Sequence, residues 1–316
     1  MLCIDLESDN PFFNLAVEEI LLKKSNEEYL LIYINKPSVI IGKHQVLPRE
    51  TDIKYITINN IPVLRRISGG GAVYHDEGNI NFTFIRNTEA GKQVDFRRNT
   101  QATIDFLLSL GVDARFEGKN DLRLGGLKIS GNAEHVHRNR VLHHGTLLFS
   151  TSLDVLRKCL RKDPSCYDSR GVESIRSSVT NIMESVKIFR NVGEFRSAMM
   201  NYFMENLPGT EVCYLSQDEI GEANSLAGTK YMTWEWNWGY GPDYQYNKKF
   251  NLQNESVSLS LQVKEGIIRE CHIEGSEKLV KTCKKLINCR HMPVEIMTMF
   301  EKEKFIIGEQ EFYNFF

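Results

Sequence analysis

The sequence predicts an α+β fold, with a large first unit and a small second unit in which strands precede helices. The chain has 316 residues, of which 41% are apolar and 25% charged, enough for one large domain or two ordinary ones. Short strand-like runs and amphipathic stretches are interspersed along the first 230 residues. The composition then changes, because all three tryptophans and four tyrosines fall within residues 230–247. We therefore expect units at residues 1–240 and 241–316.

The first unit opens with a predicted helix at residues 10–24, NPFFNLAVEEILLKK. Its apolar side chains recur at i, i+3, i+4, i+7 and i+8, which places them on one helical face. Asn10 can cap this helix, and Pro11 suits its first turn. Strand-like runs follow at 29–35, 38–44 and 62–68, and residues 72–85 predict two strands around the turn DEGN.

The later elements follow the same two periodicities. A helix at 97–110 is expected to end at Gly111, a residue suited to the position after a helix. Residues 124–136 and 141–150 flank HRNR and predict a long hairpin. Further helices are expected at 152–161, 192–207 and 277–287, and the alternation in 250–273 predicts a meander.

Composition excludes several classes of function. The net charge of −2 implies no broad basic face, so nucleic acid is not an expected partner. No apolar run reaches the roughly 20 residues that span a membrane. The N-terminal stretch MLCIDLESDNPFF lacks the basic and apolar regions of a signal peptide. The seven scattered cysteines include no C-x-x-C pair, which argues against a zinc site or disulfide framework and favours the cytoplasm.

Residues 65–71, RRISGGG, are the first candidate for binding chemistry. Three consecutive glycines allow positive φ angles and a close approach of a ligand to the backbone, whose N–H groups can cradle an anion. A strand follows, so neither a dinucleotide fingerprint nor a P-loop is present. A bulge or tight turn is the alternative reading. Because neighbouring strand residues face opposite sides, either Arg65 or Arg66 must meet the glycine loop, where it could bind a phosphate or carboxylate.

Lys128 is the second candidate, because Gly125 and Gly126 precede it and Gly131 follows it on a predicted strand. A lysine there is either a solvated surface residue or a cation that neutralises developing negative charge. Asp121, in KND, is either a turn residue or a magnesium ligand beside a nucleotide. His143 and His144 alternate across a strand and match no closed zinc set.

The order of these motifs carries a resemblance. RRISGGGAVYHDEGN, then KNDLRLGGLKISGNA, then HHGTLLFS closely resembles the lipoate–protein ligases and lipoyltransferases, relatives of the biotin ligases. PSVIIGKHQ and TWEWNWGYGPDY belong to the same pattern. The resemblance covers about residues 10–250 and implies a mixed-sheet catalytic domain followed by a small accessory domain.

By resemblance, Lys128 is the catalytic residue and contacts both the acyl carboxyl group and the phosphate. The implied nucleotide-binding residues are Arg66, Gly70, Gly71, Ala72, Val73 and Tyr74, with Asn79, Asn120, Asp121 and His144 lining the site. Asp121 is the implied magnesium ligand. After GKHQ the chain reads VLPRET, where many relatives carry asparagine and tryptophan, so octanoate stays open as an alternative substrate.

The implied reaction uses ATP and Mg²⁺ to convert lipoate into lipoyl-AMP, and then transfers the lipoyl group to a lysine of an acceptor protein. The implied acceptors are lipoyl domains of 2-oxo acid dehydrogenase complexes or the H protein of glycine cleavage. One alternative is a lipoyltransferase that uses preformed lipoyl-AMP or an acyl carrier protein and no ATP. Another is a catalytically silent binder of lipoate or lipoyl domains.

Overall fold

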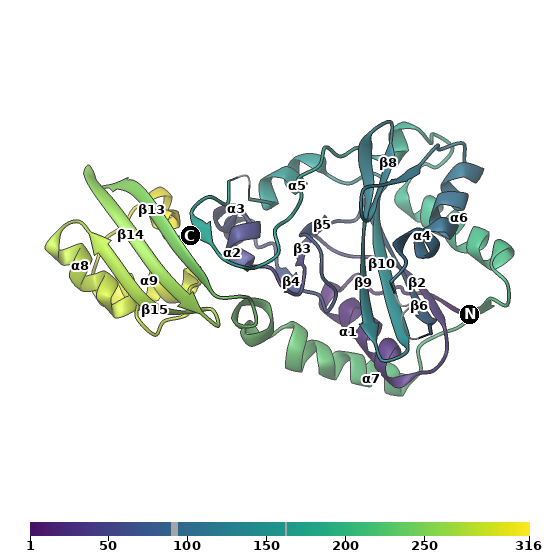
Figure 1. Ribbon diagram of the computed structural model, residues 1–316, viewed down its shortest axis with the longest axis horizontal. Helices are drawn as coiled ribbons and strands as arrows, with labels where there is room; N and C mark the ends of the chain where they lie inside the picture. The colour runs from purple at the N-terminus through teal and green to yellow at the C-terminus, as the bar shows by residue number, and fades with distance from the viewer. Residues whose placement is uncertain (90–93, 162) are drawn as a thin grey trace.

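The computed structural model describes residues 1–89, 94–161 and 163–316, and an eight-stranded mixed sheet is the frame of its larger part (Figure 1). In spatial order the strands are β12 (Glu211–Val212), β1 (Leu2–Asp5), β2 (Tyr29–Ile34), β6 (Asn79–Asn87), β10 (Arg140–Leu148), β9 (Leu127–His137), β8 (Asp121–Leu124) and β7 (Arg115–Glu117). β1 is parallel to both of its neighbours, and the other pairs are antiparallel. The α+β class with a mixed sheet is therefore confirmed.

Helices cover both faces of this sheet. The longer ones are α1 (Pro11–Lys24), α4 (Phe96–Ser109), α6 (Val192–Asn206) and α7 (Gln217–Leu226). Leu30 and Ile32 of β2 pack with α4 and α6, whereas Leu31 and Tyr33 pack on the opposite face with α1 and α7. Because both faces are covered, β2 is buried along almost its whole length, and its sequence YLLIYI shows no polar alternation.

Local signals account for the ends of the predicted helices. The Asn10 side chain accepts hydrogen bonds from the backbone N–H groups of Phe12 and Phe13, and Pro11 occupies the first helical position of α1. The helix predicted at 97–110 is α4, capped by Asp95, and the chain leaves it through Gly111 at a φ of 79°. A glycine tolerates this left-handed conformation without steric cost.

A second, three-stranded sheet lies beside the first and carries the glycine loop. Its strands are β3 (Ser38–Ile41), β4 (Val63–Arg65) and β5 (Val73–His75), in the order β4-β3-β5. The short helices α2 (Leu47–Glu50), α3 (Ile53–Ile58) and α5 (Leu153–Cys159) pack nearby (Figure 1). The predicted turn DEGN does join two strands, but these strands, β5 and β6, belong to different sheets.

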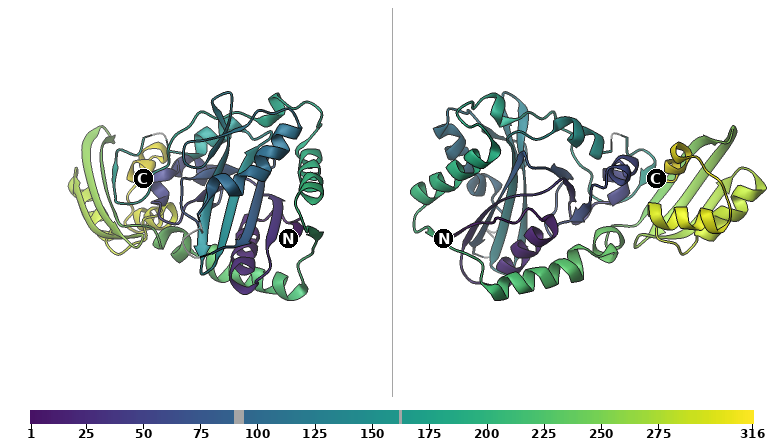
Figure 2. Two further views of the ribbon diagram at one scale, coloured as in Figure 1. Left: turned by 45° about the vertical axis from the view of Figure 1, so that its right-hand side comes forward. Right: turned by 180° about the vertical axis from the view of Figure 1, so that it is seen from behind.

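The C-terminal part is a four-stranded antiparallel sheet with helices on one side (Figures 1 and 2). It comprises β11 (Tyr167–Asp168), β13 (Tyr244–Leu252), β14 (Glu255–Lys264), β15 (Ile267–Glu274), α8 (Glu277–Cys283), α9 (Pro293–Lys302) and α10 (Glu309–Phe312). Two π-helical turns, Ala227–Tyr231 and Glu235–Gly239, lead into it from α7. Since β11 precedes residue 240, the sheet takes residues from both predicted units, and the division at 240 stays a prediction.

Within the described residues, no helix is long and apolar enough to cross a membrane.

His291 sits in the core of the C-terminal part and makes stability depend on pH. Its Nδ1 lies 2.5 Å from the Tyr244 hydroxyl, and its Nε2 lies 2.7 Å from the Phe315 carbonyl oxygen. Burial lowers the pKa of His291 from 6.5 to about 4. Between pH 6.5 and about 4, His291 is therefore protonated in the unfolded chain but neutral in the folded chain. The free energy of unfolding falls as the pH drops through this range.

We expect the denaturant midpoint to fall between pH 7 and pH 5, and His291→Gln to reduce this fall. Urea unfolding followed by near-UV circular dichroism at both pH values measures it. The exposed His272 provides the control, because His272→Gln should leave the pH dependence unchanged. An unaltered pH dependence in the His291 variant would contradict the assignment.

Candidate active site

The glycine loop, residues 69–71, is held by Arg66. The Arg66 guanidinium is buried and donates to the carbonyl oxygens of Gly69 and Gly71 at 2.5 and 2.8 Å, and to that of Ile40 at 3.1 Å. Gly70 has a φ of 87°, a conformation that side chains other than glycine rarely adopt. Burial lowers the pKa of Arg66 to about 10, so the guanidinium remains charged at neutral pH.

A second glycine lets the loop lie close to β3. A Cβ atom built on Gly42 would lie 2.1 Å from the carbonyl oxygen of Gly70, closer than two such atoms approach in proteins. Gly42 directly follows the strand in PSVIIGKHQ. Because of this close approach, even an alanine at position 42 would displace the glycine loop. The PSVIIGKHQ motif therefore supplies backbone that packs against the loop.

Arg65 points the other way, as the alternation predicted, and fastens the chain at residues 236–237. Its guanidinium donates to the carbonyl oxygens of Gln45, Trp236 and Asn237 at 2.7, 3.0 and 2.8 Å, and also to those of Gly42 and Lys43. Its backbone N–H donates to the Asn237 side chain. Arg65 is thus a structural residue of the fold, and Arg66 is the arginine of the glycine loop.

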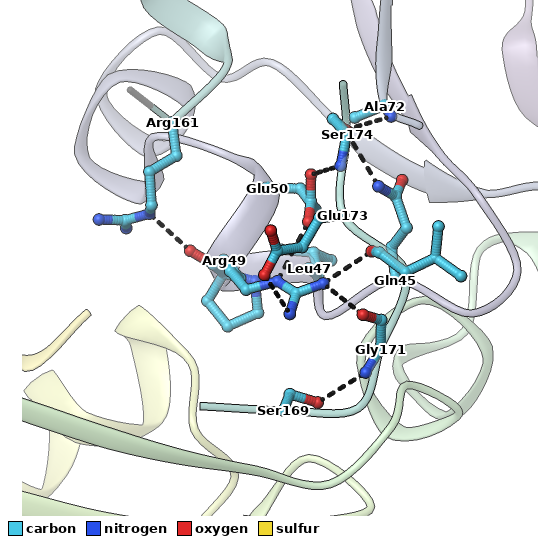
Figure 3. Close-up of polar contacts among 12 residues, drawn as sticks. Gln45, Leu47, Arg49, Glu50, Ala72, Arg161, Ser169, Gly171, Glu173 and Ser174 are labelled. Carbon is cyan, nitrogen blue, oxygen red and sulfur yellow. Dashed lines mark hydrogen bonds and ion pairs between the residues drawn. The ribbon is translucent and has the colours of Figure 1, made fainter. Parts of the chain in front are cut away.

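Residues 171–176 form a strap that crosses the glycine loop (Figure 3). The Ser174 hydroxyl accepts hydrogen bonds from the backbone N–H of Ala72 at 2.8 Å and from the Gln45 amide at 3.0 Å. A Cβ atom on Gly71 would lie 3.0 Å from the same hydroxyl oxygen. The strap therefore meets the loop at a backbone N–H group that faces the candidate site.

The buried Arg49 anchors this strap (Figure 3). Its guanidinium pairs with the carboxylates of Glu50 and Glu173 at 3.2 and 3.3 Å and donates to the carbonyl oxygens of Gly171 and Val172. Glu50 in turn accepts from the backbone N–H of Ser174. The divergent segment VLPRET thus supplies the residues that position the strap.

Lys128 lies on β9, beside the segment that follows the strap. Its backbone forms hydrogen bonds with the backbone of Ser178 and Thr180, and its ammonium lies 2.8 Å from a carboxylate oxygen of Asp121. A Cβ atom on Gly131 would lie 3.1 Å from the Lys128 ammonium, so the absence of a side chain there makes room for the lysine. Gly125 and Gly126 have a different role, because their positive φ angles form the turn between β8 and β9.

Asp121 is the predicted magnesium ligand, and its two oxygens are engaged. One accepts from Lys128, and the other lies 3.1 Å from the Arg123 guanidinium. Among the described residues there is also no group of three or more metal-ligating side chains. A magnesium ion at Asp121 would therefore have to share these oxygens with Lys128 and Arg123. The Asn120 side-chain amide donates to the backbone carbonyl of Asn132 on β9, and the Asn132 side-chain amide donates to the backbone carbonyl of Asn120 at 3.0 Å.

Two predicted residues, Arg66 and His144, are connected by a buried polar network that the sequence did not reveal. His144 Nδ1 lies 3.0 Å from the Glu18 carboxylate on α1, and its Nε2 lies 2.6 Å from the Ser68 hydroxyl. That hydroxyl accepts from Arg66. The hydrogen bonds and the charge of His144 lower the pKa of Glu18 despite its complete burial, which raises it. The network orients His144 and Arg66 relative to the glycine loop.

Asn79 and the pair His75 and Asp76 stand next to this network. The Asn79 amide donates to Asn81, and its own side-chain oxygen is buried without a partner. Asp76 accepts from the backbone N–H groups of Gly78 and Ser152, so it closes the turn that carries Asn79. Burial lowers the pKa of His75 to about 3, which keeps this histidine neutral.

A cavity of about 290 Å³ joins these parts. Its walls include Ala72, the β5 residues Val73 and Tyr74, and Lys128 from β9. Ser174 of the strap and apolar Leu148 of β10 also line it, together with charged side chains that include Arg157, Arg161 and Arg176. A mostly apolar cavity that presents a lysine suits an acid with an apolar tail whose carboxyl group reacts near Lys128.

The structure thus brings Lys128, Asp121 and the 72–74 segment together, whereas Asn79 and His144 are not among the residues that line this cavity. Sequence reasoning missed Glu18, Arg49, Glu50, Glu173 and Ser174. The only sequence signal for Gln45 was its position in the GKHQ motif. The strap residues carried no sequence signal, because they lie about 100 positions from the loop that they cover.

Comparisons with known proteins agree with this geometry. Residues 10–204 match the model of the lipoyl protein ligase A/B catalytic domain. The chain is 39% identical over 280 residues to the lipoate-protein ligase LplJ of Bacillus subtilis, which covers 87% of this chain and 85% of the relative.

Two solved structures are similar as well. Lipoate-protein ligase A bound with ATP superimposes with a TM-score of 0.65 at 30% identity, over 76% of this chain and 98% of the other. A bipartite lipoate protein ligase from Thermoplasma acidophilum, described with its E2 lipoyl domain, has a TM-score of 0.65 at 31% identity, over 76% and 96%.

Proposed function

Because the chain belongs to the lipoyl protein ligase A/B family and is a ligase, we propose that it activates lipoate with ATP and transfers the lipoyl group to a protein lysine. The observation that carries this proposal is the position of Lys128 in a mostly apolar cavity that is also lined by Ala72, Val73 and Tyr74, the residues that follow the glycine loop. The ATP-bound relative supports the choice of nucleotide.

The first step must bring two anions together. A carboxylate is a poor acylating agent, so its oxygen attacks the α-phosphorus of ATP, and pyrophosphate leaves as the mixed anhydride lipoyl-AMP forms. Lys128 reduces the repulsion between carboxylate and phosphate, because water weakens the electrostatic attraction of a fixed cation less in a water-poor site. Arg66 holds the glycine loop, whose backbone we propose to bind the nucleotide phosphates.

The second step is acyl transfer. A neutral lysine amine of the acceptor attacks the acyl carbon, and AMP leaves with the electron pair of the broken anhydride bond. Lys128 stabilises the negative charge that develops on the acyl oxygen. The apolar cavity wall limits water, which protects the anhydride from hydrolysis.

Magnesium enters this scheme with the nucleotide. Mg²⁺ usually keeps several waters and binds one or two carboxylates together with substrate phosphates. The two Asp121 oxygens pair with Lys128 and Arg123, so we propose that Mg²⁺ reaches the site on the substrate phosphates. Asp121 then orients the Lys128 ammonium.

The proposed acceptors are the lipoyl domains of 2-oxo acid dehydrogenase complexes and the H protein of glycine cleavage. The Thermoplasma ligase, which is described with an E2 lipoyl domain, supports this class of partner. We also propose that residues 241–316 form an accessory unit to a catalytic unit at 1–240, and that the enzyme acts in the cytoplasm.

The deciding experiment follows pyrophosphate release when the protein is mixed with lipoate, ATP and Mg²⁺, with octanoate in a parallel reaction. We expect release that depends on the acid and lipoylation of an added lipoyl domain. If no pyrophosphate appeared but synthetic lipoyl-AMP still lipoylated the domain, the protein would be a lipoyltransferase. Failure of both reactions would leave a silent binder.

A further prediction concerns Gly70. In Gly70→Val, a β-branched residue would have to adopt a φ of 87°, and its Cβ would lie 3.0 Å from the Arg66 guanidinium. We expect the affinity for ATP, measured by calorimetry, to fall at least about tenfold, since such strain costs of order 1–3 kcal/mol. Gly221→Val, on the exposed face of α7, controls for unspecific destabilisation. Unchanged ATP affinity would make the loop purely structural.

A further inference from the structure

Arg157, Ile175 and Arg176 line the Lys128 cavity, and Leu127 lines the groove next to it; the catalytic steps above assign no role to any of these residues. We call Leu127, Arg157, Ile175 and Arg176 the rim patch. A groove of about 530 Å³ runs along Leu127, Arg157 and Arg176 and shares wall residues with the cavity. A protein segment that lies in this groove would therefore adjoin the cavity that contains Lys128.

The rim patch exposes apolar side chains in an unusual place. Ile175 is 83% exposed although it lines the Lys128 cavity, and Leu127 is 40% exposed in the neighbouring groove. Single exposed apolar residues are common on protein surfaces. Aliphatic side chains interleaved with arginine, however, match the composition of protein interfaces, in which arginine is enriched and lysine depleted.

The two arginines can change partners at little cost. Arg157 pairs with Asp154 at 2.9 Å, but their side chains are 56% and 83% exposed, so the pair contributes little to stability. The Arg176 guanidinium donates to the backbone carbonyl of Arg161 at 3.1 Å in an exposed position. Among the described ion pairs, none joins Arg176 to a carboxylate. Both guanidinium groups are therefore open to carboxylates of another molecule.

The reaction decides what kind of molecule arrives. If the proposed function holds, an acceptor lysine must reach the acyl carbon beside Lys128, so the protein surface around that lysine lies on the rim patch. The incoming ammonium meets three cations, Lys128, Arg157 and Arg176, and like charges favour its neutral, nucleophilic form. Carboxylates flanking the acceptor lysine would offset the same repulsion between the two proteins.

We propose that the rim patch is the docking surface for the acceptor protein. Arg157 and Arg176 pair with carboxylates next to the acceptor lysine, and Ile175 and Leu127 are covered by the acceptor. This inference rests on the proposed transfer of an acyl group to a protein lysine. A nucleotide phosphate is the competing partner for the arginines, and the experiment separates the two.

The test compares Arg157→Glu with Lys158→Glu in the full-length protein. Lys158 is the matched control, because it is the next residue on α5 but turns towards Tyr55, where its ammonium lies 5.9 Å from the ring centre. Transfer is started from synthetic lipoyl-AMP, with the lipoyl domain of a pyruvate dehydrogenase complex as acceptor. Lipoate-dependent exchange of pyrophosphate into ATP is measured separately.

For Arg157→Glu we expect kcat/KM for the acceptor to fall on the order of tenfold, with a weaker dependence on salt, because a rim charge acts mainly on encounter. Pyrophosphate exchange should fall by much less than transfer, although Arg157 also lines the cavity, and Lys158→Glu should change neither reaction. Ile175→Ser should raise KM for the acceptor without altering the salt dependence. Replacing a flanking acidic residue of the acceptor by lysine should restore transfer by Arg157→Glu.

Several outcomes would overturn the proposal. Equal loss of exchange and transfer in Arg157→Glu would assign the arginine to the nucleotide. Normal transfer by both Arg157→Glu and Ile175→Ser would place the acceptor elsewhere. An unaltered protein that transfers from lipoyl-AMP without pyrophosphate exchange would refute the ligase reaction and leave the docking result valid, whereas absence of transfer would refute both.

Discussion

Replacing Lys128 by alanine is expected to reduce lipoyl transfer by a factor of roughly 10²–10³, corresponding to about 3–4 kcal/mol of transition-state stabilisation. The ammonium lies in the cavity between β5 and β9, and Asp121 holds it in position at 2.8 Å. In the proposed mechanism it acts on both the acyl oxygen and the phosphate. The loss should therefore appear in both half-reactions.

The fold should survive this change. The Lys128 side chain is 22% exposed, and β9 is held through its backbone on both sides. Single-turnover transfer from lipoyl-AMP and pyrophosphate release measure the two steps, and circular dichroism confirms folding. Lys119→Ala, an exposed lysine near the same hairpin, is the control. Near-normal turnover by Lys128→Ala would falsify its catalytic role.

The largest expected effect on stability comes from Arg65→Met, at about 3–5 kcal/mol, as for removal of one partner from a buried charged network. Methionine preserves much of the volume but leaves the carbonyl oxygens of Gln45, Trp236 and Asn237 without their donor. Burial lowers the pKa of Arg65 to about 10, so the lost group is charged under physiological conditions.

Equilibrium unfolding in guanidinium chloride measures this effect, and Arg170→Met at an exposed position is the control. We expect the binding of ATP to Arg65→Met to weaken together with stability, because the same guanidinium holds residues 42–45 against the glycine loop. A decrease in the free energy of unfolding of less than about 1 kcal/mol, the net contribution of one ordinary hydrogen bond, would mean that water replaces the guanidinium as hydrogen-bond donor.

Local signals made part of the fold predictable. The helix at 10–24 carries its own cap in Asn10 and its own start in Pro11, and the hairpin of β9 and β10 is formed by neighbouring segments. By contrast, α7 was not predicted, although Ser216 and Glu219 form a complete capping box. The glycine Gly221 and the mixed polarity of QDEIGEANSL hide its helical period.

The candidate site was predictable only where a motif is continuous in sequence. Lys128 and Arg66 stand in strings whose glycines already suggested a ligand. Ser174 acts through a single hydroxyl that meets Ala72 from 102 positions further along the chain. Nothing in one sequence encodes such a meeting, because it depends on how the strap is anchored by Arg49. The same applies to Glu18, which reads as an ordinary helix carboxylate.

The pairing of β11 with β13 bears on how this protein could have been assembled from modules. Tyr167 pairs with Tyr246, so the edge of the C-terminal sheet is encoded within the first part of the chain. A recombination event at residue 240 would deliver β13 with an unpaired edge and leave behind a strand that has no sheet to join. Exchange of the C-terminal part between homologous genes would therefore require the recipient to keep a compatible segment near residue 167.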